Sequence, residues 1–449
     1  MCKVTVIMPS LNVASYIAEC MDSVIGQTMQ DLEILAIDAG STDGTLELLR
    51  EYEKRDSRIK VVLSEKKSYG YQMNLGISMA AGEYIGVVET DDVIVPDMFE
   101  CLYQKAVETE ADYVKGSAEA FFAKNGAESI RILIRRVFDD DSMYDTVIAP
   151  CESPKLFLQD CYLWMGIYKK QFLKGIRLNE SLGAAYQDVG FLLQVISSAQ
   201  RAVYLKKIVY LYRKDNENSS IYNPKGFSYI VGEYNFCAKF LREKSKEWVS
   251  AYYQRMLAQC IVRFGYMAAS GEYWAQADTE MKELQGRLGR AISEGKLQKE
   301  DMVNEEHWEK LQVFLQSPEA AYQQFAVEYE YAKDAFYSLK KCVEKKKIVI
   351  FGSGSWGQFF YGLSNILCID CILAYCDNQK AVQGKRLNGI LIMSPEETVR
   401  KYPDAVFVIA NKNAARKMEA QLLELGVLKE RVILYTLGRN LQLFRMDEK

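Results

Sequence analysis

In the stretch AAGEYIGVVETDD at residues 80–92, an apolar run ends in a cluster of carboxylates. Residues 84–88 have the composition and length of a buried strand. Glu89, Asp91 and Asp92 follow at the point where such a strand emerges. Mg²⁺ and Mn²⁺ prefer oxygen ligands and are commonly held by one or two carboxylates together with substrate phosphates. Taken alone, the cluster is more simply read as solvated turn residues, so its neighbours in the sequence decide.

Two earlier stretches have the same form, VTVIMPSLN at residues 4–12 and ILAIDAGSTDGT at residues 34–45. Each is an apolar strand that ends in polar residues and runs into a helical pattern, at 13–28 and 43–55, with Asn12 and residues 41–43 as N-cap candidates. A further strand is predicted at 59–64. Alternating strands and helices predict a parallel α/β sheet, whose ligands bind beyond the carboxyl ends of the strands. We therefore expect Asn12, Asp38 and the acidic cluster at one edge.

With three more motifs, the first 225 residues resemble the family 2 glycosyltransferases. These are SYGYQMNLGI at 68–77, LWMGIYKKQFL at 163–173 and YQD at 186–188. The resemblance implies the nucleotide-sugar-binding fold called GT-A, with an acidic DxD motif that holds Mn²⁺ or Mg²⁺ against the donor diphosphate. It implies Asp92 as the metal ligand and Asp91 as a ribose or metal contact. The remaining donor-binding residues implied are Pro9, Asn12, Tyr16, Asp38 and Asn74.

Three positions depart from the family pattern. Ala39 stands where a second acid often follows Asp38, Met73 replaces the usual arginine before Asn74, and Glu89 takes the first position of DxD. Sites that hydrogen-bond a base discriminate more strongly than sites that only enclose it. The class of donor, a nucleotide sugar, is therefore better defined than its base, for which we expect uracil.

Asp188 is the candidate catalytic residue. From the residues alone it can also cap a helix that begins at Val189, since Asp is a favoured N-cap. The resemblance implies a general base here, and the single histidine, His307, lies in a charged stretch far from every motif. A carboxylate is then expected to deprotonate the acceptor hydroxyl, in one displacement that inverts the anomeric carbon. Trp164 is expected either to stack on an acceptor sugar or to pack in the core.

Composition places limits on the class of protein. The chain has 449 residues, 49% of them hydrophobic, which suits two or three domains, and a net charge of −4 disfavours a nucleic-acid binder. No apolar run approaches the roughly 20 residues that span a bilayer, and the sequence opens directly into a strand, so we expect a cytoplasmic protein. Eleven scattered cysteines suit reduced thiols. Cys368, Cys371 and Cys376 are expected in a core rather than on a metal.

Three segments are predicted: a GT-A domain at 1–223, a helical connector at 224–345 and a Rossmann-like domain at 346–449. The connector has few glycines and prolines, and its aromatic and aliphatic residues recur at helical spacing. Its basic end at 340–347 suits either a solvated helix end or contact with an anionic membrane surface. Contact with a membrane would place the protein at the inner face of the plasma membrane.

The last segment opens with an apolar run, the turn GSGSWG at 352–357 and a helical pattern to about residue 365. This order fits a dinucleotide-binding fingerprint made by Gly352, Gly354 and Gly357, with Asp377 where a ribose-binding acid belongs. The segment resembles small nucleotide-binding-like domains at the ends of some bacterial sugar-processing proteins. An NAD-type dinucleotide, another ligand and a structural role all remain open.

The expected function is metal-dependent, inverting transfer of a sugar from a nucleotide sugar, with UDP as the expected nucleotide. The expected acceptor is a hydroxyl of a bacterial cell-surface glycan, glycolipid or teichoic-acid-like polymer, which rests on family analogy. One alternative is a nucleotidyltransferase, although residues 9–13 lack the glycine-rich, basic loop that would bind a triphosphate. Another is a non-catalytic scaffold that senses sugars or dinucleotides.

Overall fold

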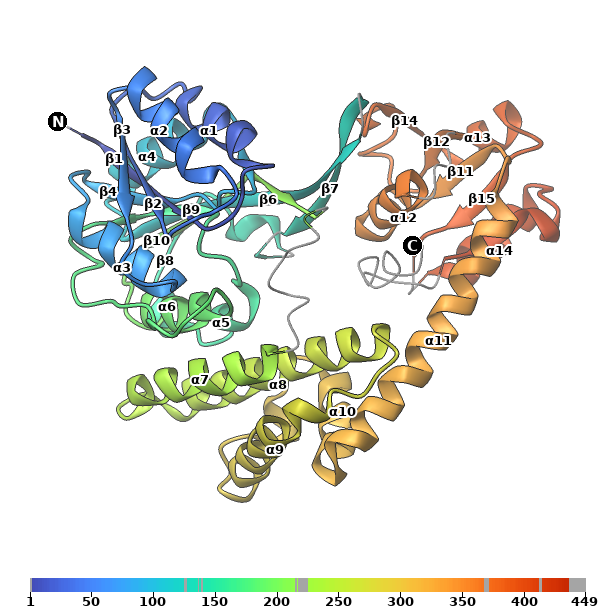
Figure 1. Ribbon diagram of the computed structural model, residues 1–449. Coiled ribbons are helices and arrows are strands. Elements are labelled where there is room, and N and C mark those ends of the chain that lie inside the picture. Colours follow the sequence, from blue (N-terminus) through green and yellow to red (C-terminus); the bar gives the residue numbers. More distant parts are fainter. Residues whose placement is uncertain are drawn as a thin grey trace. The chain divides into compact units, whose positions relative to one another are not determined.

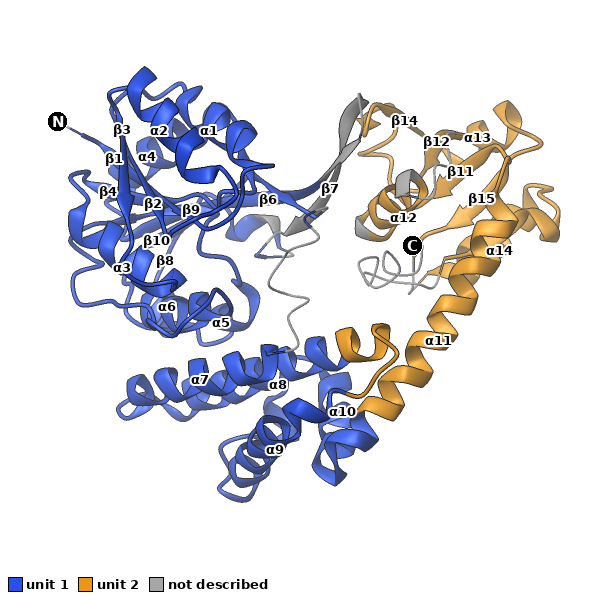
Figure 2. Ribbon diagram, in the orientation of Figure 1, with its two compact units in different colours: residues 1–121, 134–264, 274–321 blue, residues 122–133, 265–273, 322–449 orange. Residues whose placement is uncertain are grey.

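The computed structural model describes residues 2–124, 127–135, 137–138, 140–214, 216, 225–366, 371–411 and 414–435. The chain forms two compact units (Figure 2). Unit 1 comprises residues 1–121, 134–264 and 274–321, and unit 2 comprises residues 122–133, 265–273 and 322–449. Each unit has its own sheet.

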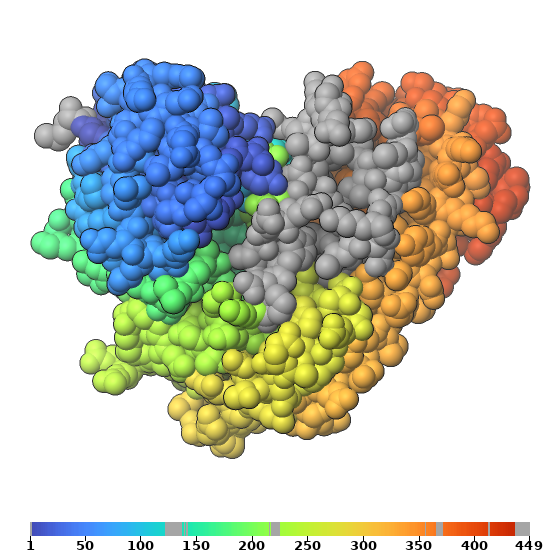
Figure 3. Space-filling view, viewed as in Figure 1, coloured from blue at the N-terminus to red at the C-terminus, as the bar shows by residue number. Residues whose placement is uncertain are grey.

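Unit 1 begins as predicted, with four parallel strands in the order β3-β2-β1-β4 (Figure 1). Their bounds are Val4–Ser10 for β1, Leu32–Asp38 for β2, Ile59–Leu63 for β3 and Tyr84–Val87 for β4. The helices between them are α1 at Ile17–Ile25, α2 at Thr45–Arg55 and α3 at Tyr69–Met79. In the space-filling view of Figure 3 this blue segment forms one closely packed body. The predicted strands and the first two helices are confirmed.

The other half of this sheet is mixed, which corrects the expectation of a parallel sheet. Beyond β4 the order continues as β9-β6-β10-β5. In addition, β7 pairs with β6 and β8 pairs with β10. Bounds are Val93–Ile94 for β5, Tyr113–Lys124 for β6, Ala127–Arg135 for β7, Val147–Ile148 for β8, Gly166–Lys169 for β9 and Ala202–Arg213 for β10. Strand β9 is antiparallel to both β4 and β6, and β10 is parallel to β6. Two reversals restore the direction of β1, so β10 ends at the same edge as β1 and β4.

Three further helices belong to this part of the chain, α4 at Met98–Thr109, α5 at Leu156–Gln159 and α6 at Gln187–Ile196. The predicted N-cap positions were wrong, although Asp43 Oδ1 does accept from the amide of Thr45, the first residue of α2, at 3.0 Å. Tyr16 and Gly44 occupy the N-cap positions of α1 and α2. Asn12 and Asp43 instead join the loops after β1 and β2, since Asn12 Oδ1 accepts from the Thr42 amide and Asp43 Oδ2 from the Ala14 amide, both at 2.9 Å.

The connector is helical, as predicted, but it is not a separate body. Its helices are α7 at Gly226–Ala238, α8 at Lys246–Ala269, α9 at Asp278–Ser293, α10 at Glu305–Gln316 and α11 at Pro318–Val343. Helix α7 packs on α6 of unit 1, whereas most of α11 belongs to unit 2. None of the helices in the described ranges has the length and apolarity needed to cross a membrane.

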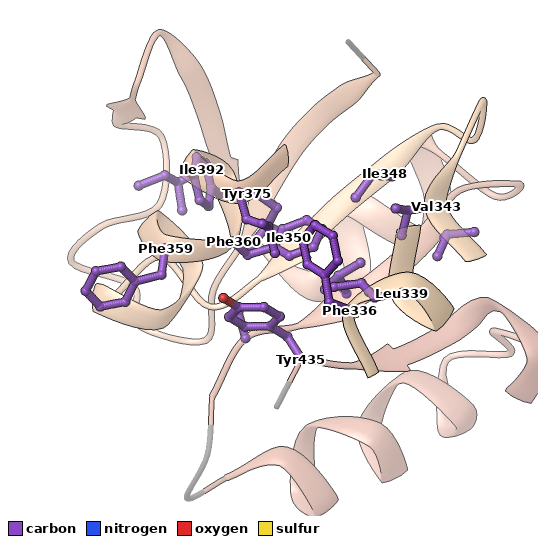
Figure 4. Close-up of a cluster of buried hydrophobic side chains, with 14 residues drawn as sticks. Phe336, Leu339, Val343, Ile348, Ile350, Phe359, Phe360, Tyr375, Ile392 and Tyr435 are labelled. Atoms are coloured by element: carbon purple, nitrogen blue, oxygen red, sulfur yellow. The ribbon is translucent and has the colours of Figure 1, made fainter. Parts of the chain in front are cut away.

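Unit 2 contains a six-stranded sheet in the order β13-β14-β12-β11-β15-β16. The strands are β11 at Ile348–Phe351, β12 at Ile372–Cys376, β13 at Arg386–Leu387, β14 at Ile390–Met393, β15 at Val406–Ile409 and β16 at Val432–Leu434. All pairings are parallel except β13 with β14. Helices α12 at Ser355–Ile366, α13 at Pro395–Lys401 and α14 at Ala415–Glu424 connect them. Phe336 and Leu339 of α11 share a core with Ile348, Ile350 and Phe360 (Figure 4).

Candidate active site

The acidic turn after β4 lies at the carboxyl edge of the sheet, as predicted, and its two aspartates differ in burial. Asp92 is fully buried. Its Oδ2 accepts a hydrogen bond from the Tyr210 hydroxyl at 2.9 Å and its Oδ1 accepts one from the Arg213 amide at 2.7 Å. Burial, reinforced by the charge of Asp91, raises the pKa of Asp92 well above its ordinary value. Asp92 thus ties the acidic turn to β10 through these two hydrogen bonds.

Asp91 is partly exposed beside Asp92. Its Oδ2 accepts a hydrogen bond from Asn216 Nδ2 at 2.8 Å, and its backbone carbonyl accepts one from Arg213 Nε at 2.7 Å. Burial lowers the pKa of Lys214 to about 8, against the opposing effect of the charges of Asp92 and Asp91. Two carboxylates and two cations therefore meet where β4 and β10 end.

Asp188 lies in the first turn of α6 and is not its N-cap, because Tyr186 takes that position with φ +67°. Burial raises the pKa of Asp188, and the nearby Arg255 guanidinium opposes that rise. The charge of Asp188 in turn raises the pKa of both Glu89 and Tyr69. The structure thus brings Asp188 into electrostatic contact with the acidic turn, about 100 positions away in the sequence.

Tyr69 hydrogen-bonds one of the carboxylates of the acidic turn. Its hydroxyl donates to Glu89 Oε1 at 2.6 Å. Burial raises the pKa of Glu89 to about 8, and the charges of Asp91 and Asp188 add to the rise while the Tyr69 hydrogen bond opposes it. Repulsion among three carboxylates is relieved when a cation or a proton is bound.

Three hydrogen bonds hold the loop before α6 and the first turn of α6, which carries Asp188. The Tyr69 amide donates to Gly183 O at 3.0 Å, and Gly183 N donates to Lys67 O at 2.8 Å, so the loop is tied to the start of α3. From α7, Glu233 Oε1 accepts from the Gly190 amide at 2.8 Å. The helical region therefore helps to hold the candidate base.

Several of the predicted donor-binding residues hold the edge loops together. Asp38 is fully buried, with Oδ1 accepting from the Gly40 and Ser41 amides, both at 2.9 Å. Pro9 O accepts from Thr90 Oγ1 at 2.9 Å, which joins the end of β1 to the acidic turn. The Tyr16 ring lies 5.0 Å from the Arg213 guanidinium carbon. The structure thus gathers Pro9, Asn12, Tyr16 and Asp38 at one edge, as predicted. Nucleoside binding by them stays a prediction.

Asn74 and Trp164 are placed differently from the other candidates. Asn74 Oδ1 accepts from the Leu178 amide at 2.9 Å and its Nδ2 donates to Leu178 O at 3.0 Å. The Asn74 side chain therefore joins α3 to the backbone at Leu178. Trp164 is 6% exposed and stacks between Tyr210, at 4.1 Å between ring centroids, and Tyr162, at 4.6 Å. This burial favours the packing role for Trp164 over stacking on an acceptor.

No preformed metal cage is present in the ranges that the structure describes, where no three His, Cys, Asp or Glu residues are placed to hold an ion. Among the cysteines of the last segment, Cys376 is buried and Cys371 partly buried. Cys368 lies outside the described residues.

Sequence reasoning missed Tyr69, Arg213 and Lys214 as site residues. Tyr69 was part of a quoted motif, but its role depends on a contact with Glu89 that spacing alone does not reveal. Arg213 and Lys214 follow β10 just as the acidic turn follows β4, and polar residues at a strand end were the signal that could have found them. That signal required knowing that β10 ends at the same edge.

In unit 2 the glycine-rich turn and Asp377 meet as predicted. Asp377 Oδ2 accepts from the Ser353 amide at 2.8 Å and from Ser353 Oγ at 2.6 Å. Gly352 has φ +112°, and a Cβ on Gly357 would lie 1.8 Å from Gly352 O. The turn thus has close helix–strand packing that only glycine permits. Binding of a dinucleotide there stays a prediction.

Comparison with known proteins bears on both units. Residues 5–164 match the family model for glycosyl transferase family 2, and residues 344–433 match a model described as C2185-like, N-terminal. Glycosyltransferase GlyA of Streptococcus pneumoniae is 32% identical over 216 residues, which are 47% of this chain and 30% of GlyA. The uncharacterized glycosyltransferase EpsJ of Bacillus subtilis is 30% identical over 48% of this chain and 62% of EpsJ. The matched region thus covers less than two thirds of either relative.

Among solved structures, that of S. aureus TarS 1-349 superimposes with a TM-score of 0.51 at 19% identity, covering 74% of this chain and 92% of that chain. The likeness supports a GT-A fold for the large mixed sheet of unit 1. Residues 5–164 therefore match the glycosyl transferase family 2 domain, and this match and the relatives named glycosyltransferases support a transferase enzyme.

Proposed function

We propose that the protein is a metal-dependent, inverting glycosyltransferase that uses a nucleotide sugar, with UDP as the nucleotide. The observation that carries the proposal is the gathering of carboxylates around Glu89 at the carboxyl edge of the sheet, where the Tyr69 hydroxyl donates to Glu89 and the charges of Asp91 and Asp188 both raise the pKa of Glu89. Such an enzyme needs one carboxylate to bind the divalent cation and another to act as the general base that deprotonates the acceptor. By family analogy, we extend the proposal to a hydroxyl of a bacterial cell-surface glycan, glycolipid or teichoic-acid-like acceptor.

Asp91 is the residue that we propose as the metal ligand, with Asp92 in support. Asp91 is partly exposed and offers hard oxygen donors, whereas both oxygens of the buried Asp92 accept hydrogen bonds from protein groups. When bound, Mn²⁺ or Mg²⁺ neutralises charge that develops on the leaving diphosphate. Lys214 lies close enough to the aspartates to add a positive charge on the same side.

Asp188 is proposed to accept the proton of the acceptor hydroxyl as that oxygen attacks the anomeric carbon. Its raised pKa moves it toward the operating pH, where a general base is most effective. The charge of Arg255 opposes the rise and so favours the ionised carboxylate that a general base requires. A single attack from the face opposite the diphosphate inverts the anomeric configuration, and no covalent intermediate with the protein is needed.

The proposal is tested with Asp188→Asn, which preserves the size of the side chain and removes the base. Release of nucleoside diphosphate is measured with a panel of nucleotide sugars, Mn²⁺ and candidate glycan acceptors. Turnover is expected to fall by about 10² or more while donor affinity is kept. Asp278→Asn, at the partly exposed first residue of α9, is the matched control. Turnover of Asp188→Asn equal to that of the control would refute the assignment of the base.

A further inference from the structure

A cavity of about 620 Å³ lies at the carboxyl edge of the unit 2 sheet. Its walls come from three places in the sequence: the turn after β11, the residues after β12 and the residues after β15. We propose that this cavity binds a diphosphate esterified at both ends, with a nucleoside on at least one end. The proposal concerns a second ligand site, separate from the transfer site of unit 1.

The strand order places this cavity where such folds bind ligands. Strand β11 lies between β12 and β15, and the parallel strands run from β11 outward in both directions. The chain thus fills one half of the sheet and then the other, which makes the gap between β11 and β15 a topological switch point. In open parallel sheets, ligands occupy the crevice beyond the strand ends at that point.

The three glycines of the turn have separate roles, and one of them faces the cavity. A Cβ on Gly352 would lie 2.8 Å from Ala410 O, and a Cβ on Gly357 would lie 1.8 Å from Gly352 O, so both are required for packing. Gly354, by contrast, lines the cavity, and a Cβ there would meet nothing within 4 Å. Packing does not explain Gly354, whereas close approach of a diphosphate to the backbone does.

The polar groups around the cavity suit a diphosphate and a ribose. Helix α12 begins directly after Gly354, and its first amides have no acceptor within the helix and favour an anion. Asp377 also lines the cavity. Its Oδ1 accepts from the Gln379 amide and its Oδ2 from Ser353. A carboxylate has about four acceptor positions, so it retains capacity for a ribose hydroxyl.

The remaining lining defines the charge and shape of the ligand. Trp356 and Met418 give one part of the wall an apolar face that suits a base or a sugar ring. Within the described part of the chain, the lining residues include no lysine or arginine. Helix amides alone suit a diphosphate esterified at both ends, with two negative charges, better than a triphosphate. Nucleotide sugars and dinucleotides share this chemistry.

The test is titration calorimetry on the full chain in EDTA, with UDP-glucose and NAD⁺ as probes and ATP as the contrast. Saturable binding of one equivalent of UDP-glucose or NAD⁺ is expected, at least tenfold tighter than ATP. Gly354→Val places a side chain in the cavity and should abolish this binding. Gly232→Val, at another open glycine, on α7, is the matched control. The melting temperature of each variant shows whether it remains folded.

UDP-glucose represents the nucleotide sugars and NAD⁺ represents the dinucleotides. The probe that binds therefore shows which of these two classes the cavity takes. Binding must also persist in Asp91→Ala, because that variant changes only the transfer site of unit 1. Absence of heat with both probes would overturn the proposal, as would ATP binding as tightly as they do. Binding that survives in a folded Gly354→Val would place the ligand elsewhere and refute the site. Loss of binding in Asp91→Ala alone would assign it to unit 1.

Discussion

Replacing Lys115 with methionine should strongly destabilise unit 1. Lys115 Nζ and the Asp160 carboxylate are both fully buried, at 2.8 and 2.7 Å from Nζ to the two carboxylate oxygens, and Nζ also donates to Tyr162 O at 2.8 Å. Methionine fills a similar volume but leaves the Asp160 charge with the Tyr204 hydroxyl, at 2.8 Å, and without its cation. Removing one partner of a buried pair costs about 3–5 kcal/mol.

The assay is urea unfolding of the full chain, followed by far-UV circular dichroism, with the unit 1 transition compared between variants. The double variant Lys115→Met/Asp160→Leu is the decisive control, because replacing both members of a buried pair with apolar groups is often close to neutral. Most of the lost stability should therefore return. A single variant that costs less than about 1 kcal/mol, or a double variant no more stable than the single one, would refute the reasoning.

Three further predictions follow from burial and packing. Burial raises the pKa of Glu233 from 4.5 to about 7, so the stability contributed by its protonated form is complete below pH 4.5. About 3 kcal/mol of that contribution is lost as the pH rises from 4.5 to about 7. Glu233→Gln should flatten this dependence in melts at pH 5 and pH 8, and an unchanged slope would contradict it. A Cβ on Gly70 would lie 1.8 Å from Asn179 O. Gly70→Ala should therefore lower the free energy of unfolding in urea by about 1–3 kcal/mol. An unchanged free energy of unfolding would show that the segment around Asn179 moves aside without cost. Because the pKa of Asp188 is raised, transfer should fall on acidification at a higher pH than an ordinary aspartate would give, and a flat acid limb of kcat/KM would exclude that base.

The first half of the unit 1 sheet was predictable because its signal is local. Each of β1, β2 and β4 is an apolar run that ends in polar residues, and this pattern fixed both the strands and their shared edge. The antiparallel insertion of β9 was not predictable, since its four residues, Gly166–Lys169, carry no mark of direction. Its direction is decided by pairing with strands distant in the sequence.

The candidate site was predictable in its location but not in its hydrogen bonding. Asp91 and Asp92 are adjacent and chemically identical, and only the fold shows that Asp92 accepts from Tyr210 and the Arg213 amide while Asp91 stays partly exposed. The same holds for Asn12, which was expected as a cap and instead binds a neighbouring loop. Sequence spacing reveals which residues reach the edge, whereas their partners come from tertiary contacts.

The most direct test of the proposed function is calorimetric titration of UDP into the full chain with and without Mn²⁺, for the native protein and for Asp91→Ala. If Asp91 holds the metal against the diphosphate, Mn²⁺ should tighten UDP binding to the native chain at least tenfold, and Asp91→Ala should remove that gain while its melting temperature is kept. Equal enhancement by Mn²⁺ in both proteins, or none in the native chain, would contradict a metal-dependent transferase acting through Asp91.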